Sequence, residues 1–262
     1  MLKKHLVVIL SLLVTSGSYG QNTDRTLSSR LPSDSANKYR IKHGNKSQLP
    51  SLLVPAALIG YGIASINNHN LKNVNAEIEE EVYTEHPHKK ITVDTYLQFA
   101  AAAAVFGLDA FGMQAKHNFR DRSMIYLMSN IILNAIVYPV KKYSHVLRPD
   151  GSSYTSFPSG HTAEAFASAE FMCHEYQDLS CWYGVAGYAM AAATGYLRMY
   201  NNRHWFGDVV AGAGVGIAST KIAYWLYPKI QRLFFKDKPA GTMIMPTWQS
   251  GTLGIALARQ FR

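Results

Sequence analysis

The sequence lacks the features of a nucleic-acid-binding protein. It has no dense basic stripe and no zinc-ligand pattern, and its 2 cysteines stand outside any such motif. Nucleic acid is therefore excluded as the expected partner. Internal repeats and low-complexity tracts are also missing, and a chain of 262 residues is long enough for one large domain with a sizeable core.

Acidic residues are scarce relative to basic ones. The chain has 17 Asp and Glu residues against 26 Lys and Arg, so its formal net charge is +9. This balance favours anionic partners, either a membrane surface or phosphorylated substrates. Cys173 and Cys181 flank a short polar loop. They are expected to be reduced if that loop is cytoplasmic, and a disulfide is an open alternative if the protein is soluble in an oxidising compartment.

Strand-like alternation is missing before residue 240, so the sequence predicts an all-α core. Apolar stretches predict helices at residues 95–115, 124–140, 160–176, 182–200 and 207–227. The second of these is expected to end at Pro139. Its polar residues Ser129, Asn130 and Asn134 are expected to face other helices rather than lipid.

The two ends of the chain differ from this core. Residues 1–20 resemble a signal peptide, with two lysines before a short apolar run and small residues before a cut at Gln21. No cysteine follows the cut, so a lipoprotein anchor is not indicated. Residues 21–49 form a polar arm. The C-terminal tail, residues 229–262, includes a β-hairpin pattern around Gln249-Ser250-Gly251.

An apolar segment and a charged loop, residues 50–94, lie between the arm and the core. The run 50–66 contains two prolines and two glycines, which weaken it as a membrane span. It is therefore expected to lie at the membrane interface. The polar residues 67–94 include a short surface helix whose buried edge is predicted to be Ile78 and Val82.

Charged residues recur at short intervals between residues 141 and 208, in an otherwise apolar region. Cleavage of a phosphate ester requires fixed cations for the phosphoryl oxygens, and Lys141, Arg148 and Arg198 are suited to that role. Each of them alone has an ordinary explanation, such as a cation at a helix end that reaches solvent. Their occurrence together with the residues below predicts a phosphate site.

Histidine and aspartate supply the reactive groups in the same region. A neutral imidazole can attack phosphorus, and a carboxylate can hold that imidazole in the correct tautomer. His204 and Asp208 are four residues apart and would share one face of a helical turn. His161 can protonate the leaving oxygen. Ser159 and Gly160 open a helix, where backbone N–H groups form a ready anion site.

These motifs resemble those of the type-2 phosphatidic acid phosphatase superfamily, which includes membrane lipid phosphatases, class A acid phosphatases and vanadium haloperoxidases. The motifs are K-x6-R-P, P-S-G-H and R-x5-H-x3-D. They match at Lys141, Arg148 and Pro149, at Pro158, Ser159, Gly160 and His161, and at Arg198, His204 and Asp208. Leu197 departs from the serine usual in the family. The resemblance covers residues 95–228 and implies a helical bundle of that kind.

The resemblance also implies a mechanism. His204 would attack phosphorus and form a phosphohistidine, and Asp208 would orient it. His161 would protonate the leaving alcohol and then activate water. Lys141, Arg148 and Arg198, with Ser159 and Gly160, would hold the phosphoryl oxygens. No cofactor and no metal is implied, because the cations belong to the protein, and vanadate should inhibit.

Membrane members of the family have an outward-facing active site. The resemblance therefore implies an inner-membrane protein with a site at the periplasmic face. Five spans are expected, or six if the N-terminus is not cleaved. It also implies a lipid phosphate substrate, such as lipid A or undecaprenyl pyrophosphate. The mean hydropathy of −0.07 is low for such a protein. The alternatives are a soluble periplasmic non-specific acid phosphatase and a non-catalytic membrane protein that binds lipid phosphate. A haloperoxidase is disfavoured, since those chains are usually much longer.

Overall fold

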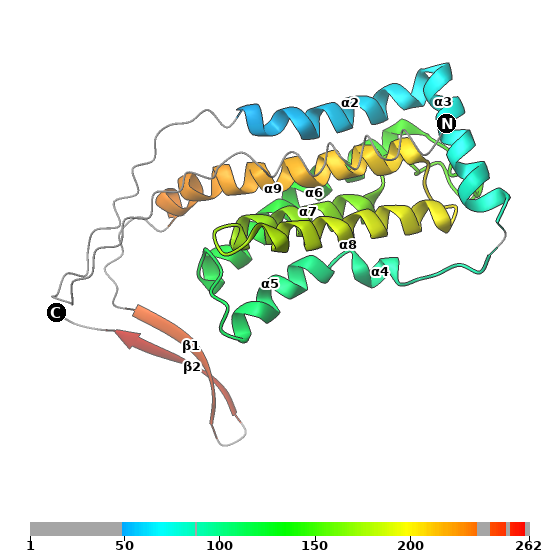
Figure 1. Ribbon diagram of the computed structural model, residues 1–262. Coiled ribbons are helices and arrows are strands. Elements are labelled where there is room, and N and C mark those ends of the chain that lie inside the picture. Colours follow the sequence, from blue (N-terminus) through cyan, green and yellow to red (C-terminus); the bar gives the residue numbers. More distant parts are fainter. Residues whose placement is uncertain (1–48, 87, 235–241, 250–251, 260–262) are drawn as a thin grey trace, which may run out of the picture. The chain divides into compact units, whose positions relative to one another are not determined.

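The computed structural model describes residues 49–86, 88–234, 242–249 and 252–259. The predicted signal peptide and all but the last residue of the predicted polar arm lie outside the described residues. The chain divides into two compact units, residues 1–224 and 225–262. The first unit holds a bundle of helices, drawn in Figure 1. This architecture confirms the predicted all-α core.

The apolar segment after residue 49 forms one continuous helix. A 3₁₀ turn, η1 (Leu49–Leu52), leads into α2 (Leu53–Asn67). The two prolines, which were expected to weaken this segment as a membrane span, do not interrupt the helix. Pro50 lies in the 3₁₀ turn and Pro55 in the first turn of α2, where a missing backbone N–H breaks no helical hydrogen bond.

The predicted surface helix is present in the charged segment. It is α3 (His69–Glu79), continued by the π-helical η2 (Glu80–Thr84). Asn68 caps α3 by accepting a hydrogen bond from the backbone N–H of Leu71 at 3.2 Å. Ile78 is buried against α9, and Val82 packs at the edge of the same cluster. Both predicted contact residues are therefore confirmed.

The helix predicted at residues 95–115 is two shorter helices, α4 (Asp94–Leu97) and α5 (Ala100–Ala110). The Gln98 side chain donates to the Thr95 carbonyl at 2.7 Å, so the Phe99 N–H turns to Tyr96 instead and the helix breaks. Helix α5 ends at Ala110, and Gly112 two residues later has a φ of 88°, which suits the left-handed position after a helix. The prediction of one continuous span here is wrong.

Helix α6 (Phe119–Ser144) is longer than predicted at both ends and contains Pro139 internally. The turn beyond the proline is held from outside. The Lys141 ammonium donates to the Thr155 carbonyl at 2.8 Å, and the Ser144 hydroxyl donates to Phe157 at 3.1 Å. These tertiary contacts offset the hydrogen bond that proline removes.

The polar residues of α6 divide into two kinds. Ser129 is buried and hydrogen-bonds to Thr220 of α9 at 2.7 Å, as the sequence predicts. Asn134 is exposed, contrary to the prediction. Its amide donates to the Asn130 carbonyl one turn earlier at 2.9 Å, so the group is satisfied without a neighbouring helix.

Helices α7 (Gly160–Tyr176) and α8 (Cys181–Tyr200) form an antiparallel pair, and α9 (Phe206–Phe234) packs beside α7. Close packing depends on glycine. A Cβ added at Gly216 would lie 2.1 Å from the Ala163 carbonyl oxygen, and one at Gly214 would lie 2.7 Å from that of Pro55 in α2. Helix α9 therefore lies against α7 on one side and α2 on another.

The hairpin predicted for the tail is present. Strands β1 (Thr242–Gln249) and β2 (Thr252–Arg259) pair antiparallel, from Thr242 opposite Arg259 to Gln249 opposite Thr252. Helix α9 runs past the predicted end of the core at residue 228. The Lys229 ammonium lies 3.6 Å from the Trp225 ring centre, a contact between successive turns that supports the helix across Pro228.

Three helices in the described part of the chain are long and apolar enough to cross a membrane: Pro50–Asn67, Phe119–Ser144 and Phe206–Arg232. This finding supports the coarse prediction of a membrane protein. Helix α7 falls short of that length, and nearly all of its residues are buried, so protein rather than lipid surrounds it. The predicted count of five spans and the interfacial placement of residues 50–66 stay predictions.

Candidate active site

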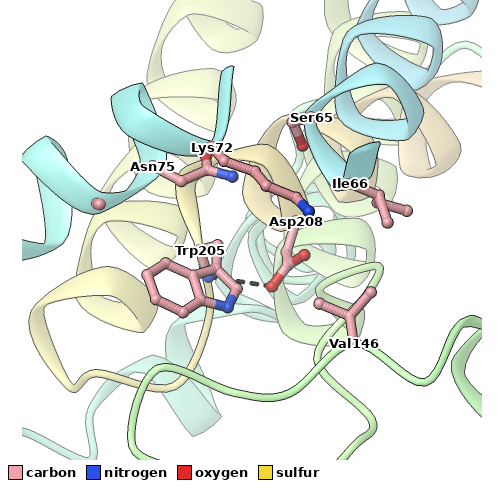
Figure 2. A pocket seen from close by; sticks show the side chains of 8 residues that line it. Ser65, Ile66, Lys72, Asn75, Val146, Trp205 and Asp208 are labelled. Carbon is pink, nitrogen blue, oxygen red and sulfur yellow. Dashed lines mark hydrogen bonds between the residues drawn. The ribbon is translucent and has the colours of Figure 1, made fainter. Parts of the chain in front are cut away.

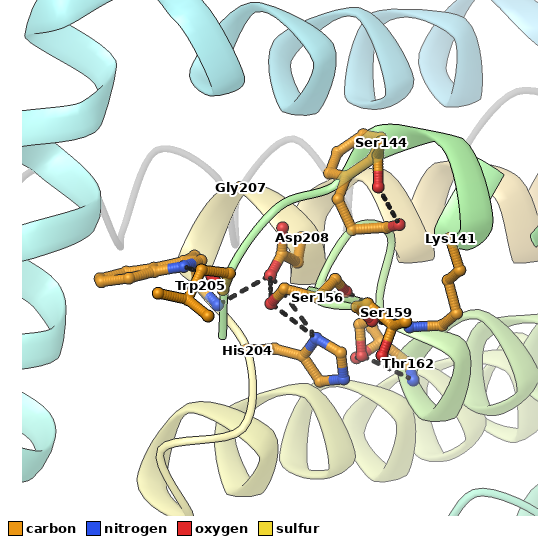
Figure 3. A network of polar contacts seen from close by, with 12 residues as sticks. Lys141, Ser144, Ser156, Ser159, Thr162, His204, Trp205, Gly207 and Asp208 are labelled. Atoms are coloured by element: carbon orange, nitrogen blue, oxygen red, sulfur yellow. Dashed lines mark hydrogen bonds and ion pairs between the residues drawn. The ribbon is translucent and has the colours of Figure 1, made fainter. Parts of the chain in front are cut away.

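His204 and Asp208 form a buried pair where α8 passes into α9 (Figure 3). The His204 Nδ1 lies 3.5 Å from the Asp208 Oδ2. That oxygen also accepts hydrogen bonds from the Ser156 hydroxyl at 2.5 Å and from the Trp205 backbone N–H at 3.0 Å. Asp208 lies in the first turn of α9, but His204 precedes the helix. The pairing that the sequence predicts is present, although the two residues do not share a helical turn.

The environment of His204 keeps its imidazole neutral. Burial lowers the pKa of His204 to about 4; the Asp208 carboxylate opposes this shift, and the charges of Lys141 and Arg198 add to it. The ring is therefore unprotonated at neutral pH. Because Nδ1 faces Asp208, Nε2 is the nitrogen available for attack on a phosphorus atom.

The start of α7 lies beside this pair. Ser159 caps the helix, since its hydroxyl hydrogen-bonds to the Thr162 hydroxyl at 2.8 Å and accepts from the Thr162 N–H at 3.4 Å. Its own backbone N–H donates to the Asp208 carbonyl at 3.0 Å. The Ser159 hydroxyl is thus engaged within the helix cap. The anion site that the sequence predicts here rests on the N–H groups of Gly160 and His161 in the first turn.

Lys141 reaches this helix start from the last turn of α6. Its ammonium donates to the carbonyls of Thr155 at 2.8 Å and Ser156 at 3.3 Å. A Cβ added at Gly160 would lie 3.6 Å from the Lys141 Cε, so the lysine stem passes directly over this glycine. Lys141 also interacts electrostatically with Arg148, Arg198 and Asp208.

Arg148 and Arg198 complete the positive charge of the site. Arg148 lies in the loop after α6, where its backbone N–H donates to the Ser153 carbonyl at 3.0 Å, and Arg198 lies in the last turn of α8. The Nε atoms of both guanidinium groups are buried and have no hydrogen-bond partner among the residues that the structure describes. Buried donors of this kind indicate a site for an anionic ligand.

His161 lies in the first turn of α7, half-buried, and interacts electrostatically with Lys141, Arg148 and Arg198. Lys141 and Arg198 also act on His204. The two histidines therefore share the same pair of cations. The structure brings together the whole predicted set: Lys141, Arg148, Ser159, Gly160, His161, Arg198, His204 and Asp208.

Sequence reasoning missed three residues that support this set. Ser156 bridges the pair, because its hydroxyl is hydrogen-bonded to Asp208 and lies 3.5 Å from the His204 Nδ1. Asn75 of α3 accepts from the Gly207 N–H at 2.9 Å, and Asp94 of α4 contacts Arg198. No spacing links Asn75 or Asp94 to the motifs, since each is more than 100 residues away along the chain from the group that it contacts. Ser156 lies two residues before Pro158 of the second motif.

A cavity of about 260 Å³ lies on the α3 side of Asp208 (Figure 2). Its lining consists of Ser65, Ile66, Lys72, Asn75, Ala76, Val146, Trp205 and Asp208. Asp208 is the one member of the predicted set in this lining, and none of the three cations borders it. The cavity therefore lies behind the histidine–aspartate pair and is not the phosphate site.

The chain is similar to known proteins over part of its length. A curated relative, the lipid A 1-phosphatase of Porphyromonas gingivalis, is 36% identical over 182 residues. The match covers 69% of this chain and 40% of the relative, so the chain spans about two fifths of the relative's length. The family model of the PAP2 superfamily matches residues 122–232.

Two solved structures are similar in fold. The crystal structure of Aquifex aeolicus LpxE has 22% identity and a TM-score of 0.46, covering 58% of this chain and 95% of that one. A transmembrane PAP2 type phosphatidylglycerolphosphate phosphatase from Bacillus subtilis has 18% identity and a TM-score of 0.47, covering 68% and 98%. All eight predicted site residues lie inside the stretch, residues 122–232, that matches the family model of the PAP2 superfamily.

Proposed function

We propose that this chain is a metal-independent phosphatase that hydrolyses the phosphate ester or pyrophosphate of a membrane lipid at the periplasmic face. One observation carries the proposal. A neutral, buried histidine paired with a carboxylate lies among three cations, two of which have buried guanidinium nitrogens without partners in the described residues. Such a site has a nucleophile and an excess of positive charge, which suits a phosphoryl group.

In the first step, His204 Nε2 attacks phosphorus and a phosphorus–nitrogen bond forms as the bond to the leaving oxygen breaks. The Nδ1 proton stays toward Asp208, whose carboxylate balances the charge that the ring acquires. Burial lowers the pKa of His161 to about 4 in the free protein, so the leaving oxygen takes its proton from an imidazolium that forms once the phosphate anion is bound. Lys141, Arg148 and the N–H groups at the start of α7 hold the phosphoryl oxygens.

In the second step, neutral His161 removes a proton from water, and the resulting oxygen attacks phosphorus. The phosphorus–nitrogen bond breaks, which returns His204 to its neutral form and releases inorganic phosphate. The ammonium of Lys141 and the guanidinium groups of Arg148 and Arg198 balance the charge of the phosphoryl oxygens in both steps. The protein itself supplies the positive charge that some phosphatases take from metal ions.

Lipid A is the first substrate to test. The curated relative at 36% identity is a lipid A 1-phosphatase, and three described helices here are long and apolar enough to cross a membrane. A site built at the ends of such helices receives a substrate whose acyl chains stay in the bilayer. Undecaprenyl pyrophosphate is the second substrate, since it presents the same kind of anionic group on a lipid.

The test is phosphate release by the purified protein from a panel of lipid phosphates and small esters, with a metal chelator present. His204→Ala should lower kcat by about 10⁴-fold or more. His174→Ala is the matched control, because His174 is also paired with an acid four residues away, Glu170 at 3.1 Å, but lies at the other end of α7. The control should keep wild-type activity.

The outcomes separate the alternatives. Release from one lipid that is lost in His204→Ala and unaffected by chelator supports the proposal and names the substrate. Activity that survives in His204→Ala contradicts the histidine mechanism. Release from small soluble esters alone indicates a non-specific acid phosphatase. Tight binding of lipid phosphate without release indicates a non-catalytic binding protein.

The membrane face can be tested with a native thiol. Cys173 and Cys181 are both free, and Cys181 is exposed at the start of α8, the end away from the site. With a periplasmic active site, Cys181 should lie on the cytoplasmic side. It should therefore resist a membrane-impermeant maleimide in intact spheroplasts and react after permeabilisation. Labelling of Cys181 in intact spheroplasts contradicts the proposed orientation.

A further inference from the structure

We infer that Asp94 is a positioning residue for the reaction: its carboxylate orients the guanidinium of Arg198 toward the phosphoryl group. The inference rests on the proposed function and deepens it. Asp94 lies on α4, outside the stretch matched to the PAP2 superfamily, so the segment before that stretch supplies part of the active site.

The contact between the two side chains is direct and shielded from water. The Arg198 Nη1 lies 2.5 Å from the Asp94 Oδ2, and the two side chains are only 11% and 2% exposed. A charge pair at this depth holds its geometry, because water does not compete for the donors. The other guanidinium pair nearby, Arg203 with Asp150 at 2.9 Å, is more exposed on both sides.

The segment that carries Asp94 is fastened to the end of α8. Asn201 and Ile91 exchange two hydrogen bonds, one from the Asn201 amide at 2.7 Å and one to its oxygen at 2.8 Å. The His88 ring stacks on the Tyr200 ring, and its Nε2 lies 2.6 Å from the Tyr200 carbonyl oxygen. These contacts hold the chain before Asp94 against the residues just after Arg198, so Asp94 approaches from a defined direction.

A guanidinium group is planar and presents its donors in a rigid fork. When Asp94 accepts from Nη1, the plane of the guanidinium is fixed, and its other N–H donors point away from Asp94. The Nε of Arg198 is buried and has no partner in the described chain, so it is left for a ligand. Asp94 also compensates the charge of Arg198 while the site is empty, where Arg148 and Lys141 would otherwise repel it.

A double-mutant cycle distinguishes positioning from a general structural role. If Asp94 acts through Arg198, Asp94→Ala should lower kcat/KM by about 10- to 100-fold, as loss of a residue that orients a ligand-binding side chain does. In an Arg198→Ala background, the same change should have an effect of less than about twofold, because nothing is left to orient. Asp94→Asn should recover part of the loss, since its amide oxygen can still accept from Nη1.

Asp109→Ala is the matched control. Asp109 forms a hydrogen-bonded ion pair with the buried Arg122, also from one helix to the next, but away from the site. This variant also takes the acid partner from a buried arginine, although Asp109 is itself 35% exposed. It should unfold at lower temperature, yet its kcat/KM per folded molecule should equal that of the wild type. The comparison removes loss of stability as the cause of an Asp94→Ala effect.

Orthovanadate binding, measured by calorimetry on the full chain, gives a readout that does not require turnover. Asp94→Ala should weaken it by about 10-fold or more, Asp94→Asn by less, and Asp109→Ala not at all. An Asp94 effect that persists undiminished in Arg198→Ala would overturn the inference and leave the proposed function standing. Wild-type protein that neither binds vanadate nor releases phosphate would overturn both.

Discussion

The two ends of α7 both bury ionisable side chains, but they pair them differently. At the active-site end, defined by Lys141, Arg148, His161, Arg198, His204 and Asp208, cations outnumber acids and two buried guanidinium nitrogens lack partners in the described residues. Toward the other end, about 14 to 21 Å from His161 along the helix axis at roughly 1.5 Å per residue, lies an acid cluster around Glu170 and Glu175. Both of these carboxylates are paired.

The acid cluster ties α7 to α8, to α9 and to the loop before α6. Glu170 accepts from the Lys221 ammonium at 2.6 Å and from Tyr188 of α8, and pairs with His174 at 3.1 Å. Glu175 accepts from the Tyr224 hydroxyl at 2.6 Å. It also accepts a hydrogen bond from the His117 backbone N–H at 3.0 Å, and the His117 ring nitrogen Nδ1 lies 2.8 Å from its other oxygen. Each carboxylate therefore has a donor from α9 and from at least one other element.

This comparison separates stability from function. A buried polar network in which every group has a partner favours one native packing arrangement and leaves no free hydrogen-bond donor or acceptor for a ligand. A network with unpaired donors costs stability and is retained where it binds something. The carboxylates of the acid cluster are of the first kind and the proposed active-site end is of the second, although α7, α8 and α9 contribute to both. Arg122, which interacts with Glu175, also has two buried guanidinium nitrogens without partners in the described residues, so unpaired donors mark a ligand site only where other cations gather around them.

The largest effect is expected at the acid cluster. Glu170→Ala leaves Lys221, Tyr188 and His174 without their shared acceptor, which should lower the free energy of unfolding by about 3–5 kcal/mol. The activity per folded molecule should not change. Thermal unfolding in one detergent, with kcat measured on the folded fraction, checks both. A large loss of kcat with little loss of stability would show that the cluster takes part in function.

Arg148→Ala should show the reverse pattern. Removal of one phosphate-binding cation should lower kcat/KM by about 10²- to 10³-fold. Stability should stay equal or rise, because the substitution removes a buried Nε without a partner in the described chain. The same two measurements apply. A strongly destabilised Arg148→Ala with normal kcat/KM would mean that the arginine supports the fold and not the ligand.

The smallest effect concerns pH. Burial lowers the pKa of His204 to about 4, so the ring stays neutral until the pH falls through that value. An ordinary histidine with a pKa near 6.5 would be neutral in only roughly a tenth of the molecules at pH 5.5. Here nearly all should stay neutral, so His204 should add no acidic limb near pH 6.5, once the ionisation of the substrate and of His161, whose pKa burial also lowers to about 4, is measured separately and divided out. An acidic limb near 6.5 would contradict the buried environment described for His204.

Short-range patterns in the sequence predicted the parts of this structure that depend on local chemistry. The bounds of α7 agree with the prediction because Pro158, Ser159 and Gly160 mark its start. The three motifs also predicted which residues converge, since cations, histidines and an acid rarely recur in an apolar region unless they bind an anion. The site residues could be proposed from the sequence alone, but the contacts between them could be identified only in the tertiary structure.

The misses share a physical cause, which is that tertiary contacts override local preference. Pro139 does not end α6, because Lys141 and Ser144 hold the following turn from outside. The alanine-rich stretch splits where the Gln98 side chain donates a hydrogen bond to the Thr95 carbonyl. Asp94 becomes a site residue only through a fold that brings it to Arg198, and no pattern along the chain carries that information.

The bond from the Ser159 N–H to the Asp208 carbonyl has a mechanical consequence. Asp208 contacts the proposed nucleophile with its side chain and the start of α7 with its backbone carbonyl. Gly212 of α9 packs closely against the Ser159 carbonyl and joins the same two elements, so the proposed nucleophile and the proposed anion site are held at a fixed separation. In the proposed reaction, these two groups therefore need no hinge between them.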